Sequence, residues 1–409
     1  MLFILRLNNV KNNHKPLKTH LLKNSLMEKP YIQAVATYVG FVIGAGILGI
    51  PFVVAKAGFL TGLIDIILIG IIFAILNMYM GEIALSTKGH HQLPGYAKIY
   101  LGNKGKLLMS FSLIFGMSGS IIAYIVKGGE FLAALLQPSF GGNLLLYALL
   151  FFIPLAYLTH RGLKAVENAE VYMVSIILVI VVILGFVGMK HINPSNLTGF
   201  SLGKLFIPFG VVMFSFLGTG AIPEIREELQ NHKHLMKKSI MTGACIVTVV
   251  YILFALIVIG ISGEAVTDGA IIGLGDILGT PILIIGIIFG LLTMSTSFIA
   301  IGTALKESYV FDFKISEKNA FRIACFIPLA VAILILLSGI TNAFFKILDI
   351  TGIIAGGLVG FIIIPMVWKA KAHHNRKPEY KIPDNKIIEI AILIVFTLGI
   401  LFEFIRILF

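Results

Sequence analysis

The chain has 409 residues, of which 58% are hydrophobic and 13% are charged. Soluble domains usually contain about 45–50% apolar and about 25% charged residues, so this composition excludes an ordinary soluble protein. The net charge of +12 would suit a nucleic-acid-binding protein as well as a membrane protein, and the positions of the basic residues distinguish the two.

Eleven apolar stretches along the chain approach or exceed the roughly 20 residues that a helix needs to cross a bilayer. They cover residues 31–57, 60–87, 107–137, 144–158, 170–188, 205–229, 240–261, 281–305, 319–337, 343–368 and 387–405. The sequence therefore predicts an all-α integral membrane protein.

The basic residues are distributed unevenly between the two sides that these stretches define. When a residue near a span end is counted with the adjoining connection, 26 of the 32 Lys and Arg residues fall in alternate connections that begin with the N-terminal segment. Five fall in the other connections, and Lys127 lies within a span. Basic residues near membrane spans concentrate on the cytoplasmic side, so this charge does not indicate a nucleic-acid partner. We expect a plasma-membrane protein with a cytoplasmic N-terminus and an external C-terminus.

Two of the predicted spans are interrupted by nearly the same glycine and proline signature. Residues 44–51 read GAGILGIP, and residues 218–223 read GTGAIP. A break in mid-membrane exposes backbone N–H and C=O groups, which only a buried polar cavity tolerates. Paired breaks in corresponding halves indicate the binding site of a secondary transporter built from inverted repeats.

Five spans in each half give the halves opposite orientations, because an odd number of crossings reverses the direction of the chain. This predicts a first repeat over residues 30–190 and a second over residues 204–369. Residues 1–29 would be a flexible basic tail, with Met27 as the expected start because it directly precedes the first span. A basic cytoplasmic loop at 370–386 would lead to an eleventh helix at 387–409.

Four passages of the chain form a recognisable set. They are IGAGILGIPF at 43–52, GEIALSTKGHHQLPGYAKIYLG at 81–102, FSFLGTGAIPE at 214–224 and STSFIAIGTALKESYVFDF at 295–313. Together they resemble the amino acid/polyamine/organocation (APC) superfamily, and more narrowly the amino acid/auxin and aromatic amino acid permeases. The resemblance covers spans one to ten. It implies a LeuT-like five-plus-five inverted repeat with discontinuous helices 1 and 6, and secondary active transport by alternating access.

A zwitterionic amino acid needs a partner for its carboxylate and one for its ammonium, and the ends of a broken helix offer both through the backbone. At the first break, the free N–H groups would belong to Ala45, Gly46 and Ile47, and glycine at 44 and 46 would permit close approach of the ligand. The other substrate-binding candidates are Gly44, Tyr124, Phe214, Phe216, Gly218, Thr219 and Gly220. The resemblance suggests an aromatic gate at the second break, with Phe214 as the first choice.

The breaks contain no acidic side chain, and small residues at 218 and 220 would leave room for a large substrate. Neutral amino acids, aromatic ones included, are therefore the expected substrates. Coupling to sodium or to protons stays open at this point. No other cofactor or metal is expected.

Sodium would suit the hydroxyls of Thr293, Thr296 and Ser297, whose spacing places them on one helical face. The resemblance puts the partner carbonyls at Gly40 and Ile43, as in sodium-coupled relatives. Ordinary hydrogen bonds of Ser and Thr to their own helix are an equal alternative.

Protons would need an acidic group in the membrane. Glu224 directly follows the second break, and Lys127 and Glu130 can pair on one face of the third span.

Three other functions can be compared with ion-coupled transport. One is an amino acid exchanger or facilitator without ion coupling. A channel would need a continuous polar lining, whereas these spans carry isolated polar residues. An enzyme would need a nucleophile with a base, or an intramembrane metal set, which the sequence does not offer. The expected partners are a small amino acid and the lipid bilayer, with no obligate protein partner.

Overall fold

The computed structural model describes residues 15–162, 167–267, 269–373 and 375–408, and every regular element in these ranges is helical. The helices are α1 (Lys15–Val42), α2 (Gly46–Ala57), α3 (Phe59–Ser86), α4 (Leu93–Phe140), α5 (Leu144–Arg161), α6 (Glu167–Gly188), α7 (Phe209–Ser215), α8 (Ile222–Glu228), α9 (Met236–Ser262), α10 (Ile271–Leu278), α11 (Thr280–Phe311), α12 (Glu317–Ser338), α13 (Ala343–Thr351), α14 (Gly357–Ala372) and α15 (Lys386–Leu408).

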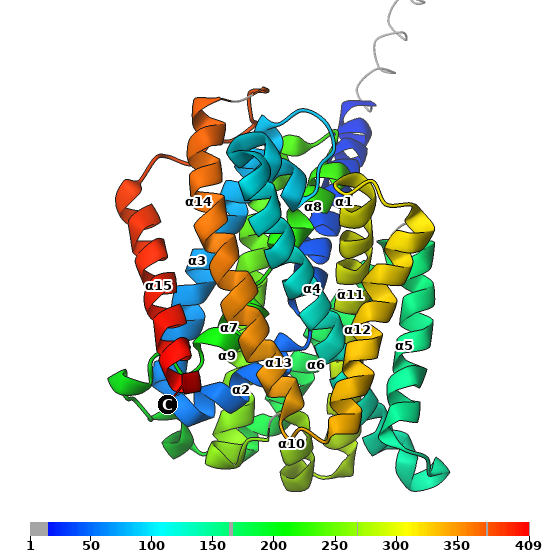
Figure 1. Cartoon of the computed structure of the whole chain (residues 1–409). Helices are drawn as coiled ribbons and strands as arrows, with labels where there is room; N and C mark the ends of the chain where they lie inside the picture. The colour runs from blue at the N-terminus through cyan, green and yellow to red at the C-terminus, as the bar shows by residue number, and fades with distance from the viewer. Residues whose placement is uncertain (1–14, 163–166, 268, 374, 409) are drawn as a thin grey trace, which may run out of the picture.

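The long helices form one bundle (Figure 1). α1 begins at one end of it, and α15 runs toward the other end. We call the end where α1 begins the inner end, because the charge distribution predicts that it faces the cytoplasm, and the opposite end the outer end. α4 lies at the centre of this arrangement, since it packs against α5, α11, α12, α13 and α14.

Within the described residues, eight helices are long and apolar enough to cross a membrane, and the bent pair of α1 and α2 makes a ninth. The other two predicted spans correspond to shorter or more charged segments. The sixth is divided into α7 and α8, each of seven residues, and the eleventh is α15, which carries charged residues near both ends.

The first predicted break is present between α1 and α2, whose axes differ by 55°. Its cause is visible in the backbone, because the Gly44 amide donates to the Val42 carbonyl at 2.9 Å and so leaves the helical pattern. The second break is present between α7 and α8. There a short 3-10 turn (Thr219–Ala221) precedes α8, and Pro223 lies in the first turn of α8, where a proline costs no hydrogen bond.

Three features of the helices differ from the sequence prediction. α1 begins at Lys15, so the helix extends into the stretch predicted as a flexible tail, while residues 1–14 lie outside the described residues. α4 begins at Leu93 rather than at 107, and Gly102, with φ of 72°, kinks it where the amphipathic first part meets the apolar part. In the tenth span, a π-helical turn (Gly352–Gly356) separates α13 from α14.

Gly352 supports the contact between this π-helical turn and α7. A Cβ at position 352 would overlap the Gly210 carbonyl oxygen and would lie 2.7 Å from the Phe214 amide nitrogen. Both neighbours are backbone atoms, which cannot move aside as a flexible side chain can.

We therefore predict that Gly352→Ala destabilises the protein by about 1–3 kcal/mol, the usual cost of overpacking. The measurement is thermal unfolding of the detergent-purified protein. Gly203→Ala is the matched control, because no atom lies within 4 Å of its added Cβ. Equal melting temperatures for the two variants would contradict the prediction.

Candidate functional site

The break in the first span frees two backbone carbonyl groups, one within α1 and one just after its end. The Gly40 and Ile43 carbonyls have lost their usual helical donors, and both accept from the Ser297 hydroxyl of α11, at 2.7 and 3.2 Å. Ser297 is fully buried. The structure thus brings together three of the residues named as ion-coupling candidates.

The two threonines of the same helical face make different contacts. Thr293 donates to the Gly290 carbonyl at 2.9 Å, and Thr296 donates to the Thr293 carbonyl at 2.8 Å. Both hydroxyls therefore bond to their own helix, as the alternative reading of the sequence allowed. Both threonines are buried, as Ser297 is.

Tyr124 of α4 reaches the first break. Its hydroxyl forms hydrogen bonds with the Ser297 and Ser120 side chains and with the Ala45 backbone amide. A Cβ on Gly44 would collide with this hydroxyl, so glycine at 44 makes room for Tyr124. The amide of Ala45, expected to meet a substrate carboxylate, here meets a phenol oxygen instead.

Tyr251 of α9 connects the two breaks. Its hydroxyl lies 2.9 Å from the Val42 carbonyl at the end of α1 and 2.7 Å from the Ser215 carbonyl at the end of α7. The ring is completely buried, and Phe216 packs edge-on against it with 5.1 Å between ring centres. The sequence does not single out Tyr251, because a tyrosine in an apolar helix has no local pattern that distinguishes a bridging role from packing.

The glycines of the breaks allow the two broken helices to touch. A Cβ on Gly46 would overlap Ser215, and one on Gly218 would lie 2.7 Å from Val42. A Cβ on Gly220 would lie 2.7 Å from both Phe41 and Met117. The expectation that positions 218 and 220 leave room for a large substrate is therefore wrong for this conformation, because neighbouring side chains fill that space.

A small cavity of about 40 Å³ remains beside the second break. Thr219 and Gly220 line it together with Phe41, Met117 and Ser120, among others. Phe214 is buried in the last turn of α7, whereas Phe216 follows that helix and packs on Tyr251. In this conformation the cavity beside the second break is too small for an amino acid.

Lys127 and Glu130 form a second cluster on α4, about one helical turn beyond Tyr124 toward the outer end. Their side chains make an ion pair, as their spacing predicted. The Lys127 ammonium also lies 4.7 Å from the ring centre of Phe344 in α13. A Cβ on Gly269, in the segment that leads to α10, would lie 3.2 Å from this ammonium. Lys127 therefore lies where α4, α13 and the outer segment before α10 meet.

The inner end is closed by contacts of α8. Arg226 is buried and donates to the Thr87 and Gly89 carbonyls at 2.8 and 2.6 Å. Thr37 of α1 donates to Glu228 at 2.8 Å. Glu224 lies in the first turn of α8, where its charge complements the helix dipole.

Asp312 lies just beyond α11, among the residues of the inner end. Burial raises the pKa of its carboxyl group to about 6, although hydrogen bonds from Ser308 and Gly95 act in the opposite direction. Since the folded protein holds this proton more tightly than the unfolded chain, acidification from about pH 6 toward the ordinary aspartate pKa stabilises the folded protein.

Residues 27–405 match the model of the tryptophan/tyrosine permease family. The chain is 26% identical over 381 residues to tyrosine-specific transport system 1 of Haemophilus influenzae, which covers 88% of this chain and 92% of the relative. It is 22% identical over 243 residues to amino acid transporter AVT3A of Arabidopsis thaliana, which covers 56% of each chain.

Among solved structures, the chain resembles MhsT in complex with L-phenylalanine, with a TM-score of 0.67 and 17% identity. The match covers 91% of this chain and 98% of that one. MhsT has the LeuT fold, so the expected fold is confirmed.

We predict that Tyr251→Phe lowers the transport rate strongly while the protein still folds. Loss of the hydroxyl leaves the Val42 and Ser215 carbonyls facing each other without their shared donor, which costs about 1–3 kcal/mol for a buried polar group. Uptake by proteoliposomes and the melting temperature should be measured together. Tyr172→Phe is the control, because Tyr172 is 71% exposed on α6. Wild-type uptake by Tyr251→Phe would show that the bridge is dispensable.

Proposed function

Because the chain belongs to the tryptophan/tyrosine permease family, we propose that it is a secondary active transporter of aromatic L-amino acids, with tyrosine and tryptophan as the first substrates. The observation that carries this proposal is the meeting of two unwound backbone segments, bridged by Tyr251, in the middle of the bundle. The name of the Haemophilus influenzae relative and the phenylalanine bound to MhsT support the aromatic class.

The backbone of the two breaks would recognise the zwitterion. The first amides of α2 carry partial positive charge and favour the carboxylate. Ala45 would exchange its contact with Tyr124 for one with the substrate, leaving the phenol free to donate a second hydrogen bond to the same carboxylate. The carbonyl ends of α1 and α7, near Val42 and Ser215, carry partial negative charge and favour the ammonium.

The aromatic side chain would enter the space that begins as the 40 Å³ cavity. Phe41, Met117 and Leu217 offer apolar surface around it, and Thr219 offers a hydroxyl. Binding must widen this cavity, because its present volume is far below the roughly 300–1,000 Å³ of ordinary ligand pockets. We infer that α1 and α8 move away from α4 and α11 as the substrate enters, which is the rocking motion of alternating access.

Sodium is the first candidate for the coupling ion. The carbonyls of Gly40 and Ile43 and the hydroxyl of Ser297 converge, and Thr296 lies one residue away on the same buried helix face. This is an all-oxygen donor set, which suits a hard cation. A bound sodium ion would supply the positive charge that holds the broken α1 against α11.

Proton coupling is the second candidate, and one observation favours it. The Ser297 hydroxyl already donates to the Gly40 and Ile43 carbonyls. These two oxygens therefore have a hydrogen-bond partner without a cation. A proton would then act through an acid in the moving segment, and Glu224 in the first turn of α8 is the nearest to the break in sequence.

We predict saturable uptake of radiolabelled tyrosine by proteoliposomes, with competition by tryptophan and phenylalanine and little competition by lysine or glutamate. The breaks hold no charged side chain that would pair with a charged substrate. Sodium and proton gradients should be imposed separately. Failure of every aromatic amino acid to compete would contradict the proposed substrate class.

A pair of serines in α11 tests the coupling site. Ser297→Ala removes the hydroxyl that joins α11 to the carbonyls of α1, so we expect an increase of about tenfold or more in the sodium concentration for half-maximal uptake, equal to about 1.4 kcal/mol. Ser295→Ala is the control, because its hydroxyl bonds to the Leu291 carbonyl of the same helix. Uptake that ignores sodium, and that Glu224→Gln abolishes, would favour protons.

A further inference from the structure

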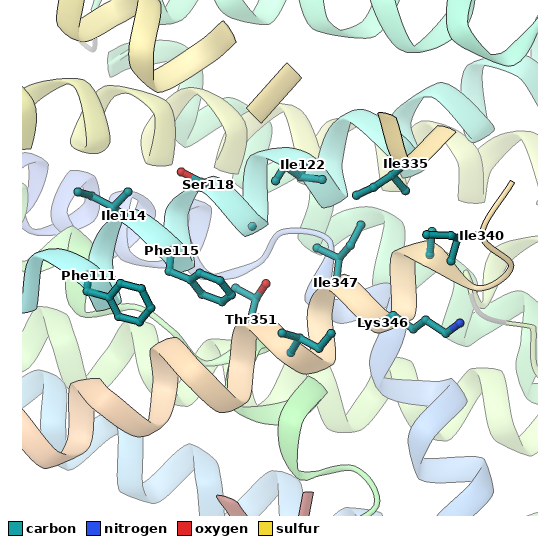
Figure 2. Close-up of a pocket in the computed structure, with 13 residues that line it drawn as sticks. Phe111, Ile114, Phe115, Ser118, Ile122, Ile335, Ile340, Lys346, Ile347 and Thr351 are labelled. Carbon is teal, nitrogen blue, oxygen red and sulfur yellow. The ribbon is translucent and has the colours of Figure 1, made fainter. Parts of the chain in front are cut away.

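A cavity of about 550 Å³ lies between α4, α12 and α13, apart from the breaks. Its lining is almost entirely apolar. Figure 2 shows Phe111, Phe115 and Ile122 along α4, facing Ile347 and Thr351 of α13. Ile335 and Ile340 bound the cavity at one end.

This cavity is a groove that opens to the surroundings of the bundle. Phe111 and Ile340, near its two ends, are 51% and 49% exposed, and Ile350 in its wall is 44% exposed. α4, α12 and the segment Ala343–Ala372, which contains α13, are each long and apolar enough to cross a membrane. In a membrane protein such exposed apolar side chains face lipid, so hydrocarbon chains have direct access to the groove.

Within the part of the chain that the structure describes, Lys346 is the one charged residue that lines the groove. It lies at the same end as Ile340, toward the outer end of α13 (Figure 2). Among the described residues, no carboxylate forms an ion pair with it. A lysine within a span is expensive unless its ammonium extends to the headgroup region and finds an anion there.

We propose that this groove is a binding site for an anionic phospholipid of the outer leaflet, with one acyl chain between α4 and α13 and the phosphate held by Lys346. The apolar lining fits the chain, and the single ammonium at the outer end fits the headgroup. The volume falls within the range of ordinary ligand pockets, roughly 300–1,000 Å³. This site is separate from the amino acid site and does not depend on which amino acid is carried.

The groove wall is also part of the support for the broken sixth span. Thr351 lines the groove and directly precedes the π-helical turn Gly352–Gly356. Gly352 in that turn packs against the backbone of Gly210 and Phe214 in α7. A lipid chain in the groove therefore contacts the end of α13 that leads directly into the π-helical turn packed against α7.

The single tryptophan of the chain makes a direct binding test possible. In a Trp368→Phe background, Phe115→Trp places the only tryptophan in the groove. The full-length protein is reconstituted in vesicles of ordinary phosphatidylcholine. Increasing fractions of a second lipid with brominated acyl chains are added, which is phosphatidylglycerol in one series and phosphatidylcholine in the other. Bromine quenches tryptophan fluorescence on contact, so the titration gives the relative binding constant of each lipid.

We expect phosphatidylglycerol to bind about fivefold more tightly than phosphatidylcholine, the gain typical of one lysine at an anionic headgroup. Lys346→Gln should reduce this ratio to about one, and Lys346→Arg should retain it. Lys204→Gln, at an outer-end lysine that does not line the groove, should leave the ratio unchanged. Phe186→Trp, with the phenylalanine 72% exposed on α6, should report ordinary lipid contact without headgroup preference.

Two results would overturn the proposal. The first is a headgroup preference at position 115 that persists in Lys346→Gln. The second is absence of quenching by either brominated lipid, which would mean that protein rather than lipid fills the groove. Tyrosine uptake by the same vesicles shows that each variant is folded, and a failure of uptake in all of them would concern the proposed function and not the lipid site.

Discussion

One phenol hydroxyl, that of Tyr251, lies between the carbonyl ends of two half-helices. α1 and α7 end with carbonyl groups that carry partial negative charge, and these ends converge at Val42 and Ser215. Without a shared donor these ends would repel each other in a medium that contains no water to screen them. The Tyr251 hydroxyl therefore stabilises the side-by-side placement of the breaks, and the proposed substrate and coupling sites both depend on that placement.

Glycine residues and side-chain hydroxyl groups have different roles at the breaks. Glycines at 44, 46, 218 and 220 remove the side chains that would hold the helices apart, and Tyr124 and Ser297 supply the polar contacts that the unwound backbone requires. The same tight contact leaves little space for a ligand. In the proposed cycle, the substrate thus competes with contacts that the empty protein makes with itself, and this competition links binding to movement.

The sequence was sufficient for the fold because helix breaks and span lengths are local properties. The motifs at 44–51 and 218–223 contain the residues that interrupt the helices, and the structure has both interruptions. The partners of those breaks are not local. Tyr251 lies in a span whose sequence is almost entirely apolar, so only the packing identifies it. The small residues at 218 and 220 misled the prediction for the same reason, since Phe41, Val42 and Met117 come from other helices.

The π-helical turn at Gly352–Gly356 accommodates one more residue than an α-helical turn of the same height. Each residue of an α-helix advances the chain by about 100° around its axis, so this turn fixes how the faces of α13 and α14 are rotated relative to each other. Deleting a single residue from it would allow a straight α-helix, but Asp349 and Thr351 would then leave their present neighbours in α15 and α4. The register of the tenth span is thus set by an irregularity, and straightening the helix would uncouple its outer half from the rest of the transporter.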